Sequence, residues 1–237
     1  MSDGIYVSMN GAAARMAQLD AVSDNLANVQ TPGFKAERPA FEAFLANADR
    51  RLDATKVYAA AVSTKVDLSP GPVEQTNDPL DVLPSGGSFL GVLTDRGVAL
   101  TRNGHLRVDA DGSLTAAGHP VVDPDGRRIV APPNALVRVD PSGLVFGNDV
   151  PLGKIALFDV AGPLDRIGPS LLAPQDAKQL TPSADHLRIG QYETGNASAL
   201  EAAVQLVGAQ RHFEASIQAL QTYKRLDDRA TDIGRIK

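Results

Sequence analysis

The sequence predicts an α+β protein in which an N-terminal and a C-terminal helix pair as a coiled coil around a central all-β domain. Apolar residues at both ends of the chain recur at alternating three- and four-residue spacings, which is typical of helices that pack against a partner. Between the ends the apolar period changes to two, and Gly, Asn and Asp turns separate short segments. The predicted helical domain therefore comprises residues 1–31 and 196–237, and the predicted β domain comprises residues 86–165.

The composition fits a globular protein and argues against several classes of function. With 237 residues, 43% of them apolar, the chain is long enough for one or two domains with a buried core. The net charge of -5 and the lack of a basic stripe argue against a nucleic-acid partner. No apolar run is long enough to cross a membrane, so no membrane insertion is expected. The first basic residue is Arg15 and no signal-like apolar core precedes it, so we expect no cleaved secretory signal.

The N-terminal helix is defined by one heptad line, which is interrupted only at Ser23. The apolar members of this line are Ile5, Met9, Ala12, Met16, Leu19 and Leu26. Pro32 disfavours the helical conformation at Thr31, and Gly33 permits a turn. The helix is therefore expected to end near Asn28.

Two asparagines stand in the last turns of this helix. Asn25 and Asn28 are three residues apart and so share a face, although their amides compete for backbone groups in a helix interior. We predict that both amides bond backbone groups of a neighbouring chain. The alternative is that they only fray the end of the helix.

The stretches that flank the β domain, residues 32–85 and 166–195, are expected to be extended linkers. Within the first, Phe41, Phe44 and Leu45 have the spacing of a short helical turn. Further on, prolines and glycines such as those of residues 69–72 indicate an extended connection.

Three similar turns punctuate the predicted β domain, at residues 108–112, 122–126 and 139–143. In each, an aspartate side chain can cap the turn, and a glycine three residues later can take a positive φ. Asp-x-Asp-Gly also begins like a calcium loop. The glutamate that completes an EF-hand would, however, fall at Pro120 or Asn134, so no metal site is expected.

The C-terminal helix carries two apolar stripes side by side. The first stripe consists of Ala203, Leu206, Phe213, Ile217 and Leu220, and the second of Leu200, Val204 and Val207. Ser198 with Glu201 three residues later is typical of a helix start, because the two side chains can satisfy free backbone N–H groups. No proline follows Pro182, so a continuous helix of up to about 55 Å is expected. Such a helix is wide and long enough to face more than one neighbour.

Catalytic constellations are absent from the sequence. The four histidines follow no metal-ligand spacing, and neither a GxSxG elbow nor a phosphate-binding glycine loop is present. We therefore expect no catalytic, metal or cofactor site, and a protein that is not an enzyme.

Three motifs, in order along the chain, resemble those of the bacterial flagellar axial proteins, the rod and hook family. They are residues 23–35 (SDNLANVQTPGFK), 97–114 (GVALTRNGHLRVDADGSL) and 191–196 (QYETGN). The chain departs from the family pattern at Leu100, Gly195, Ala197 and Ala203. Its short length and its opening residues 4–9 are most similar to the proximal-rod member, with the distal-rod member as the alternative.

The resemblance implies a structural subunit that polymerises through its terminal helices into the hollow axial shaft of the flagellum. It also implies export through the flagellar type III apparatus without a cleaved signal, a place in the periplasmic rod, and contacts with copies of itself and with other rod proteins. The residues expected at the assembly interface are Ile5, Met9, Met16, Leu19, Asn25, Leu26, Asn28, Leu206, Phe213, Ile217 and Leu220. A different class of function also stays open: a soluble module, enzyme or adhesin, whose two helices fold onto its own sheet.

Overall fold

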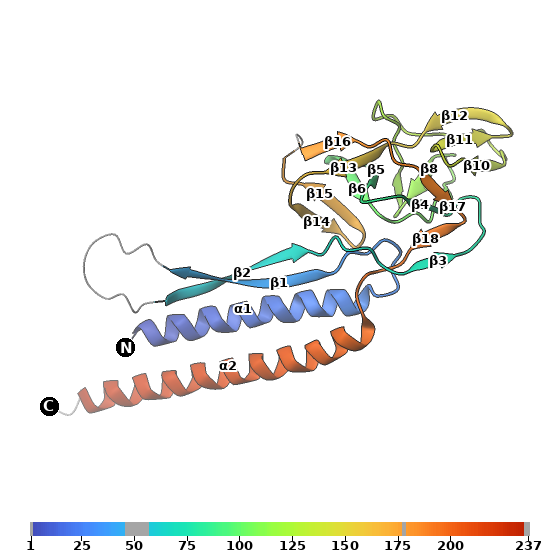
Figure 1. Cartoon of the computed structure of the whole chain (residues 1–237). Helices are drawn as coiled ribbons and strands as arrows, with labels where there is room; N and C mark the ends of the chain where they lie inside the picture. Colours follow the sequence, from blue (N-terminus) through green and yellow to red (C-terminus); the bar gives the residue numbers. More distant parts are fainter. Residues whose placement is uncertain (1, 46–56, 177–178, 235–237) are drawn as a thin grey trace. The chain divides into compact units, whose positions relative to one another are not determined.

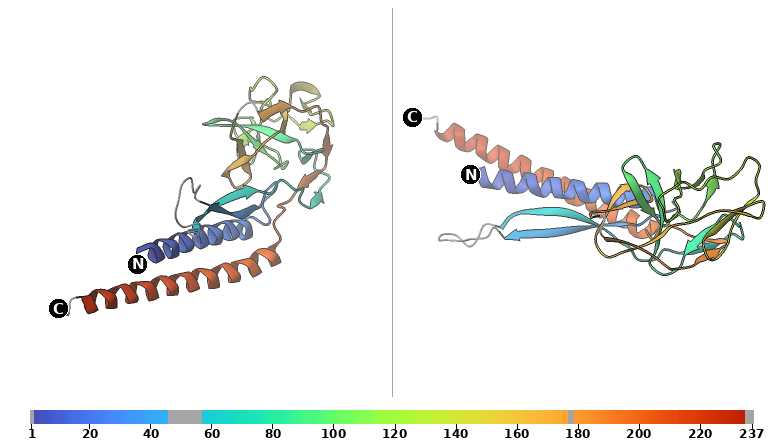
Figure 2. Two further views of the ribbon diagram at one scale, coloured as in Figure 1. Left: turned by 60° about the vertical axis from the view of Figure 1, so that its left-hand side comes forward. Right: turned by 90° about the horizontal axis from the view of Figure 1, so that it is seen from above.

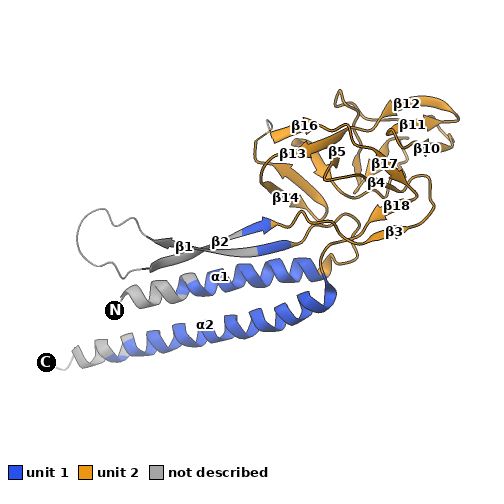
Figure 3. Ribbon diagram, viewed as in Figure 1, with its two compact units in different colours: residues 1–26, 37–65, 198–237 blue, residues 27–36, 66–197 orange. Residues whose placement is uncertain are grey.

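The computed structural model describes residues 2–45, 57–176 and 179–234 and divides the chain into two compact units (Figures 1 and 3). Unit 1 comprises residues 1–26, 37–65 and 198–237. Unit 2 comprises residues 27–36 and 66–197. The fold class is α+β, with one helix at each end of a sheet-rich middle, as the sequence predicts. Pairing of the two helices as a coiled coil stays a prediction.

Unit 1 is built from the two terminal helices and a strand pair. Helix α1 (Ser2–Ala27) ends one residue before the expected position, and α2 (Ala199–Gly234) is 36 residues long, or about 54 Å. The two helices run in opposite directions (Figures 1 and 2). The backbone N–H of Glu201 donates a hydrogen bond to the Ser198 hydroxyl at 3.4 Å, so Ser198 caps α2 as predicted.

A two-stranded sheet of β1 (Glu37–Leu45) and β2 (Val57–Val66) follows α1 in the chain. The prediction of a helical turn at residues 41–45 is therefore wrong. The apolar spacing of a short segment does not distinguish a helical turn from a strand, and here pairing with β2, which the local sequence does not reveal, selects the strand.

The buried face of α1 differs from the predicted heptad line. Ala14, Ala21, Val22 and Asn25 are buried, whereas Met9 and Met16 are 50% and 55% exposed. Ala12 is the member of the predicted line that is buried, and the side chain of Ile5 lies outside the described residues. Small side chains allow close approach, so the covered stripe follows the alanines and leaves the larger methionines towards solvent.

Unit 2 consists of short antiparallel strands in five sheets. A six-stranded sheet has the order β14-β15-β6-β5-β13-β16, and two three-stranded sheets have the orders β10-β11-β12 and β7-β8-β9. Two further pairs, β17-β4 and β18-β3, join strands that are far apart in the sequence. The bounds are β3 (Val73–Gln75), β4 (Val82–Pro84), β5 (Phe89–Thr94), β6 (Gly97–Thr101), β7 (Arg107–Val108), β8 (Leu114–Ala116), β9 (His119–Pro120), β10 (Val137–Val139), β11 (Leu144–Gly147), β12 (Val150–Lys154), β13 (Leu157–Val160), β14 (Leu164–Gly168), β15 (Leu171–Pro174), β16 (Leu180–Pro182), β17 (Leu187–Ile189) and β18 (Gln191–Glu193).

The main core of unit 2 lies among these sheets. Leu90, Leu114, Val121 and Ile155 are almost completely buried in it, and Leu187 joins them from the end of the unit. Strands thus continue on both sides of the expected range of 86–165, into stretches that were expected to be linkers. Those strands are short and rich in Pro and Gly, and their partners are distant in sequence, so local alternation does not reveal them.

The three aspartate turns form as predicted and share one hydrogen-bond pattern. The N–H groups of Gly112, Gly126 and Gly143 donate to the carbonyl oxygen three residues earlier, each at 2.9 Å. All three glycines have positive φ, between 78° and 84°. The turns therefore close hairpins by the chemistry that the sequence indicates.

Candidate functional site

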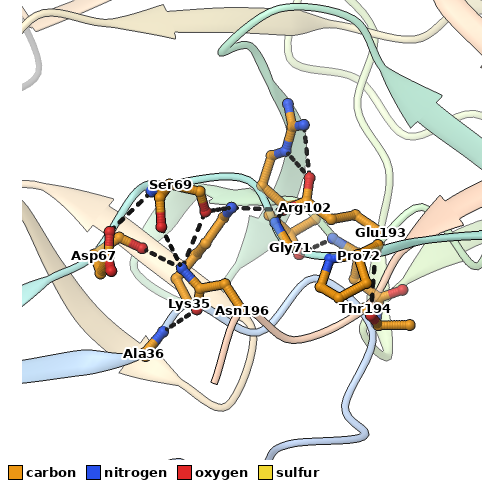
Figure 4. A network of polar contacts seen from close by, with 12 residues as sticks. Lys35, Ala36, Asp67, Ser69, Gly71, Pro72, Arg102, Glu193, Thr194 and Asn196 are labelled. Carbon is orange, nitrogen blue, oxygen red and sulfur yellow. Dashed lines mark hydrogen bonds and ion pairs between the residues drawn. The ribbon is translucent and has the colours of Figure 1, made fainter. Parts of the chain in front are cut away.

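A buried ion cluster lies where three sequence motifs meet in unit 2 (Figure 4). Its centre is Glu193 at the end of β18, with Lys35 and Arg102 on either side. Their side chains are only 1%, 2% and 6% exposed, respectively. Three ionised groups at this depth require mutual pairing and further hydrogen bonds, because an unpaired charge in the interior is strongly unfavourable.

Each oxygen of the Glu193 carboxylate accepts two hydrogen bonds. Oε1 accepts hydrogen bonds from Lys35 Nζ at 2.6 Å and from the Gly71 N–H at 2.8 Å. Oε2 accepts from Arg102 Nε at 2.9 Å and Nη2 at 2.7 Å, so the guanidinium binds it through two donors. Lys35 Nζ also donates to the Ser69 carbonyl at 2.7 Å, and Arg102 Nη1 donates to the Ser88 carbonyl. The Glu193 carboxylate thereby joins its own segment to the segments that contain Lys35, Gly71 and Arg102.

The environment shifts two of these ionisations. Burial lowers the pKa of Lys35, and the hydrogen bond to Glu193 and its charge offset part of this shift. Burial alone would raise the pKa of Glu193. The charge of Arg102, the Gly71 N–H and Lys35 outweigh this, so the pKa of Glu193 lies below its usual value. The donors and positive charges around Glu193 therefore favour its ionised carboxylate.

Gly33 brings the first motif into this cluster. Its N–H donates to the Glu193 carbonyl at 2.7 Å, and its φ is +67°. A Cβ at this position would lie 2.1 Å from the backbone nitrogen of Asn103, which no side chain could accommodate. Only glycine fits, because both the backbone conformation and the close approach exclude a side chain.

Asn25, in the last turn of α1, and Asn28, directly after the helix, bond groups of their own chain. The Asn25 side chain, in a residue that is only 8% exposed, donates from Nδ2 to the Glu37 carbonyl and accepts at Oδ1 from the Glu37 N–H, both at 2.8 Å. Asn28 Oδ1 accepts from the Thr31 hydroxyl at 3.1 Å. The Asn25 amide thus joins α1 to the start of β1 in unit 1, and the bonds of both asparagines to a neighbouring chain stay a prediction.

The two stripes of α2 differ in exposure. Leu206, Phe213, Ile217 and Leu220 of the first stripe are half-buried, and Ala209 beside them is buried. In the second stripe, Leu200 is 78%, Val204 65% and Val207 50% exposed. On α1, Leu19 and Leu26 are half-buried. The structure thus places the predicted interface residues on the two terminal helices, in unit 1, except Asn28, which follows α1 in unit 2, and their role in assembly stays a prediction.

The sequence analysis did not single out Lys35, Arg102 or Glu193. Each stands inside one of the three motifs, next to a glycine or proline turn, and their mutual contacts span 158 and 91 positions along the chain. A charged residue in each of three turn-rich motifs was the available signal. The cluster cross-links segments of the chain, because its polar atoms are bonded to one another and to backbone groups.

Among the described residues, no helix is long and apolar enough to cross a membrane. Within residues 2–45, 57–176 and 179–234, no three His, Cys, Asp or Glu side chains gather where they could hold a metal ion.

Two family models match the ends of the chain. Residues 5–35 match a model described as flagella basal body rod protein. Residues 190–233 match a model described as flagellar basal body rod FlgEFG protein C-terminal. These ranges contain most of α1 and α2 together with Gly33, Lys35, Glu193 and Asn196.

Curated relatives match over nearly the whole chain. The flagellar basal-body rod protein FlgF of Escherichia coli is 29% identical, over 97% of this chain and 96% of its own length. The protein of the same name from Mesorhizobium japonicum is 27% identical, over 99% of both chains. The flagellar basal-body rod protein FlgG of Buchnera aphidicola is 27% identical, over 94% of this chain and 96% of its own length.

Proposed function

Because the chain belongs to the flagellar basal-body rod family and is FlgF-like, we propose that it is a structural subunit of the rod that polymerises through its terminal helices. The product is the hollow axial shaft of the bacterial flagellum. FlgG is the alternative within the family, because relatives of that name match nearly as well. The family is one of structural proteins, so catalysis is not part of the proposal.

The observation that carries the proposal is the apolar surface of α2. Leu200, Val204 and Val207 lie within two turns of the helix and are all at least half exposed. All three fall within residues 190–233, which match the C-terminal family model. A contiguous exposed apolar stripe on a helix marks a protein contact, because its exposure to water is unfavourable.

Copies of the same chain, and of related rod proteins, supply the cover for this stripe. The half-buried stripe of Leu206, Phe213 and Ile217 would form the coiled-coil seam with α1, and the exposed stripe would face the next subunit. A contact between two different surfaces that does not close on itself builds a helical filament. The helical domain of this plan comprises residues 1–31 and 196–237, with the β domain carried outside the tube.

Localisation follows from the same proposal. The subunit is exported by the flagellar apparatus and assembles in the periplasmic part of the basal body. Its partners are its own copies, the other rod proteins and the export apparatus.

A charge placed in the proposed coiled-coil seam between α1 and α2 tests the proposal. Leu206→Asp places a carboxylate in an apolar contact, which costs roughly a few kcal/mol per subunit. His212→Asp is the matched control, because His212 is exposed and lies at least about 80° around the helix from every residue of the two stripes. Both subunits should be secreted, and only the control should yield complete rods in electron micrographs of isolated basal bodies. Normal motility of the Leu206→Asp strain would refute the proposal.

The soluble-module alternative makes the opposite prediction for the monomer. Helices that fold onto the module's own sheet would protect their amides in the isolated chain. In a rod subunit, amides in the N-terminal half of α1 and the C-terminal half of α2 exchange fast in the monomer and slowly in assembled rods.

A further inference from the structure

Unit 2 is built from two stretches of chain, residues 27–36 and 66–197. Each stretch has two ends, so four connections lead from unit 2 into the rest of the chain, at residues 27, 36, 66 and 197. The pairing of β1 with β2 brings the connections at residues 36 and 66 side by side, whereas no strand pair joins the connections at residues 27 and 197 to them. Their positions in unit 2 therefore call for a specific cause.

The Asn196 side chain bonds two of these connections at once (Figure 4). Its Oδ1 accepts a hydrogen bond from the Ala36 N–H at 2.6 Å, and its Nδ2 donates to the Asp67 carbonyl at 2.8 Å. Nδ2 also lies 3.0 Å from the Ser69 carbonyl. The Asp67 N–H donates to the Ala36 carbonyl at 2.8 Å, which closes the group. Asn196 itself precedes the third connection, at residue 197.

The fourth connection passes against the neighbouring Gly195. A Cβ on Gly195 would lie 2.8 Å from the Val29 carbonyl oxygen and 3.1 Å from that of Asn28. The segment that follows α1 is therefore in backbone contact with the segment that precedes α2. All four connections leave unit 2 beside residues 195 and 196.

This group is fixed to the interior of unit 2. The Thr194 N–H donates to the Pro72 carbonyl at 2.9 Å, and the Asn196 N–H donates to the Phe34 carbonyl at 3.2 Å. Glu193, the residue before Thr194, is held in the buried ion cluster by Lys35 and Arg102. The backbone on either side of the Asn196 side-chain amide is therefore fixed to unit 2.

We propose that Asn196 is a positioning residue that clamps together the four connections of unit 2. Its planar amide offers an acceptor and a donor in fixed directions, so it sets the spacing between the segment that enters β1, the segment that leaves β2 and the segment that enters α2. The role in assembly rests on the proposed function, because subunits can share one helical lattice only if these segments leave unit 2 in one arrangement. The clamp itself is a property of the monomer.

Hydrogen exchange on the full-length monomer tests the clamp directly. Asn196→Ala removes the amide, and Asn196→Asp keeps its shape but turns a carboxylate oxygen towards the carbonyls of Asp67 and Ser69. Asn196→Ala should accelerate exchange at the Ala36 and Asp67 amides by at least about tenfold, the factor that corresponds to one lost hydrogen bond. Asn196→Asp keeps the acceptor for the Ala36 N–H and should accelerate exchange at the Asp67 amide. Exchange at the core amides of Leu90 and Leu100 should be unchanged.

Thr101→Val is the matched control, because it also removes hydrogen bonds within unit 2. The Thr101 hydroxyl donates to the Ser170 carbonyl at 2.7 Å and accepts from the Asn103 N–H at 3.0 Å, and none of these residues belongs to the four connections. This variant should change exchange at Ala36 and Asp67 by less than about twofold. Unchanged exchange at these amides in Asn196→Asp, or equal acceleration in the control, would overturn the clamp.

Counts of complete rods in the variant strains separate this proposal from the proposed function. Asn196→Ala should be secreted and yield fewer complete rods than Thr101→Val, whereas equal rod numbers in the two strains would overturn the positioning role. Complete rods in the Leu206→Asp strain would refute the proposed function, but the exchange result would still decide whether Asn196 clamps the monomer. Absent rods in Leu206→Asp together with unchanged exchange in Asn196→Ala would leave the function standing and remove the clamp.

Discussion

Replacement of Glu193 by glutamine should strongly destabilise unit 2. Glutamine has the shape of the glutamate, but it has one acceptor oxygen in place of two and carries no charge. Its NH₂ group would face donors of Lys35 or Arg102, which now approach the carboxylate at 2.6–2.9 Å. Both cations would remain buried without a counter-ion. Removal of one partner of a buried pair costs about 3–5 kcal/mol, a large share of the 5–15 kcal/mol that stabilises a typical domain.

Urea unfolding, with hydrogen exchange at unit 2 amides as a separate readout, measures this effect. The midpoint should fall by roughly 1–2 M urea. Asp149→Asn is the matched control: it removes the charge from the exposed Arg138–Asp149 pair, whose atoms are 3.0 Å apart, and should cost at most about 0.5 kcal/mol. In a double-mutant cycle, Lys35→Met should cost less in the Glu193→Gln background than in the parent. Additive losses, or a loss below about 1 kcal/mol for Glu193→Gln, would refute the reasoning.

Two further predictions concern ionisation. The pKa of Glu193 lies below its usual value in the folded state, so its contribution to stability is present above that usual value and is lost as the pH falls through the lower folded pKa. The urea midpoint should therefore drop below about pH 4.5, and drop less in Glu193→Gln; equal slopes would contradict this. The hydrogen bond from the Tyr192 hydroxyl to Glu74, at 2.6 Å, raises the pKa of Tyr192 to about 12. Glu74→Gln should return this pKa towards 10, measured as the difference in ultraviolet titration between each protein and its Tyr192→Phe variant; an unchanged value would show that Glu74 is not the cause.

Features that depend on neighbours in the sequence could be predicted from it. The ends of α1 near Pro32 and of α2 near Ser198, and the three aspartate turns, each follow from residues within one or two turns of chain. The second apolar stripe of α2 could also be recognised from its spacing, but the spacing did not show that the stripe is exposed. Strand β1 was predicted as a helical turn, because its residues have no clear alternation and its strand conformation depends on pairing with β2.

The ion cluster marks the limit of this kind of inference. Lys35, Arg102 and Glu193 are far apart in sequence, and no periodicity connects them. The motifs that contain them could be recognised, but recognition did not say that their charged residues meet. That meeting gives the motifs a physical reason: Gly33 permits the close approach, Glu193 neutralises the buried cations, and Asn196 bonds the chain connections beside them. We therefore propose that residues needed for assembly also lie off the helix faces, because Asn196 and the ion cluster bond the segments by which the chain leaves unit 2.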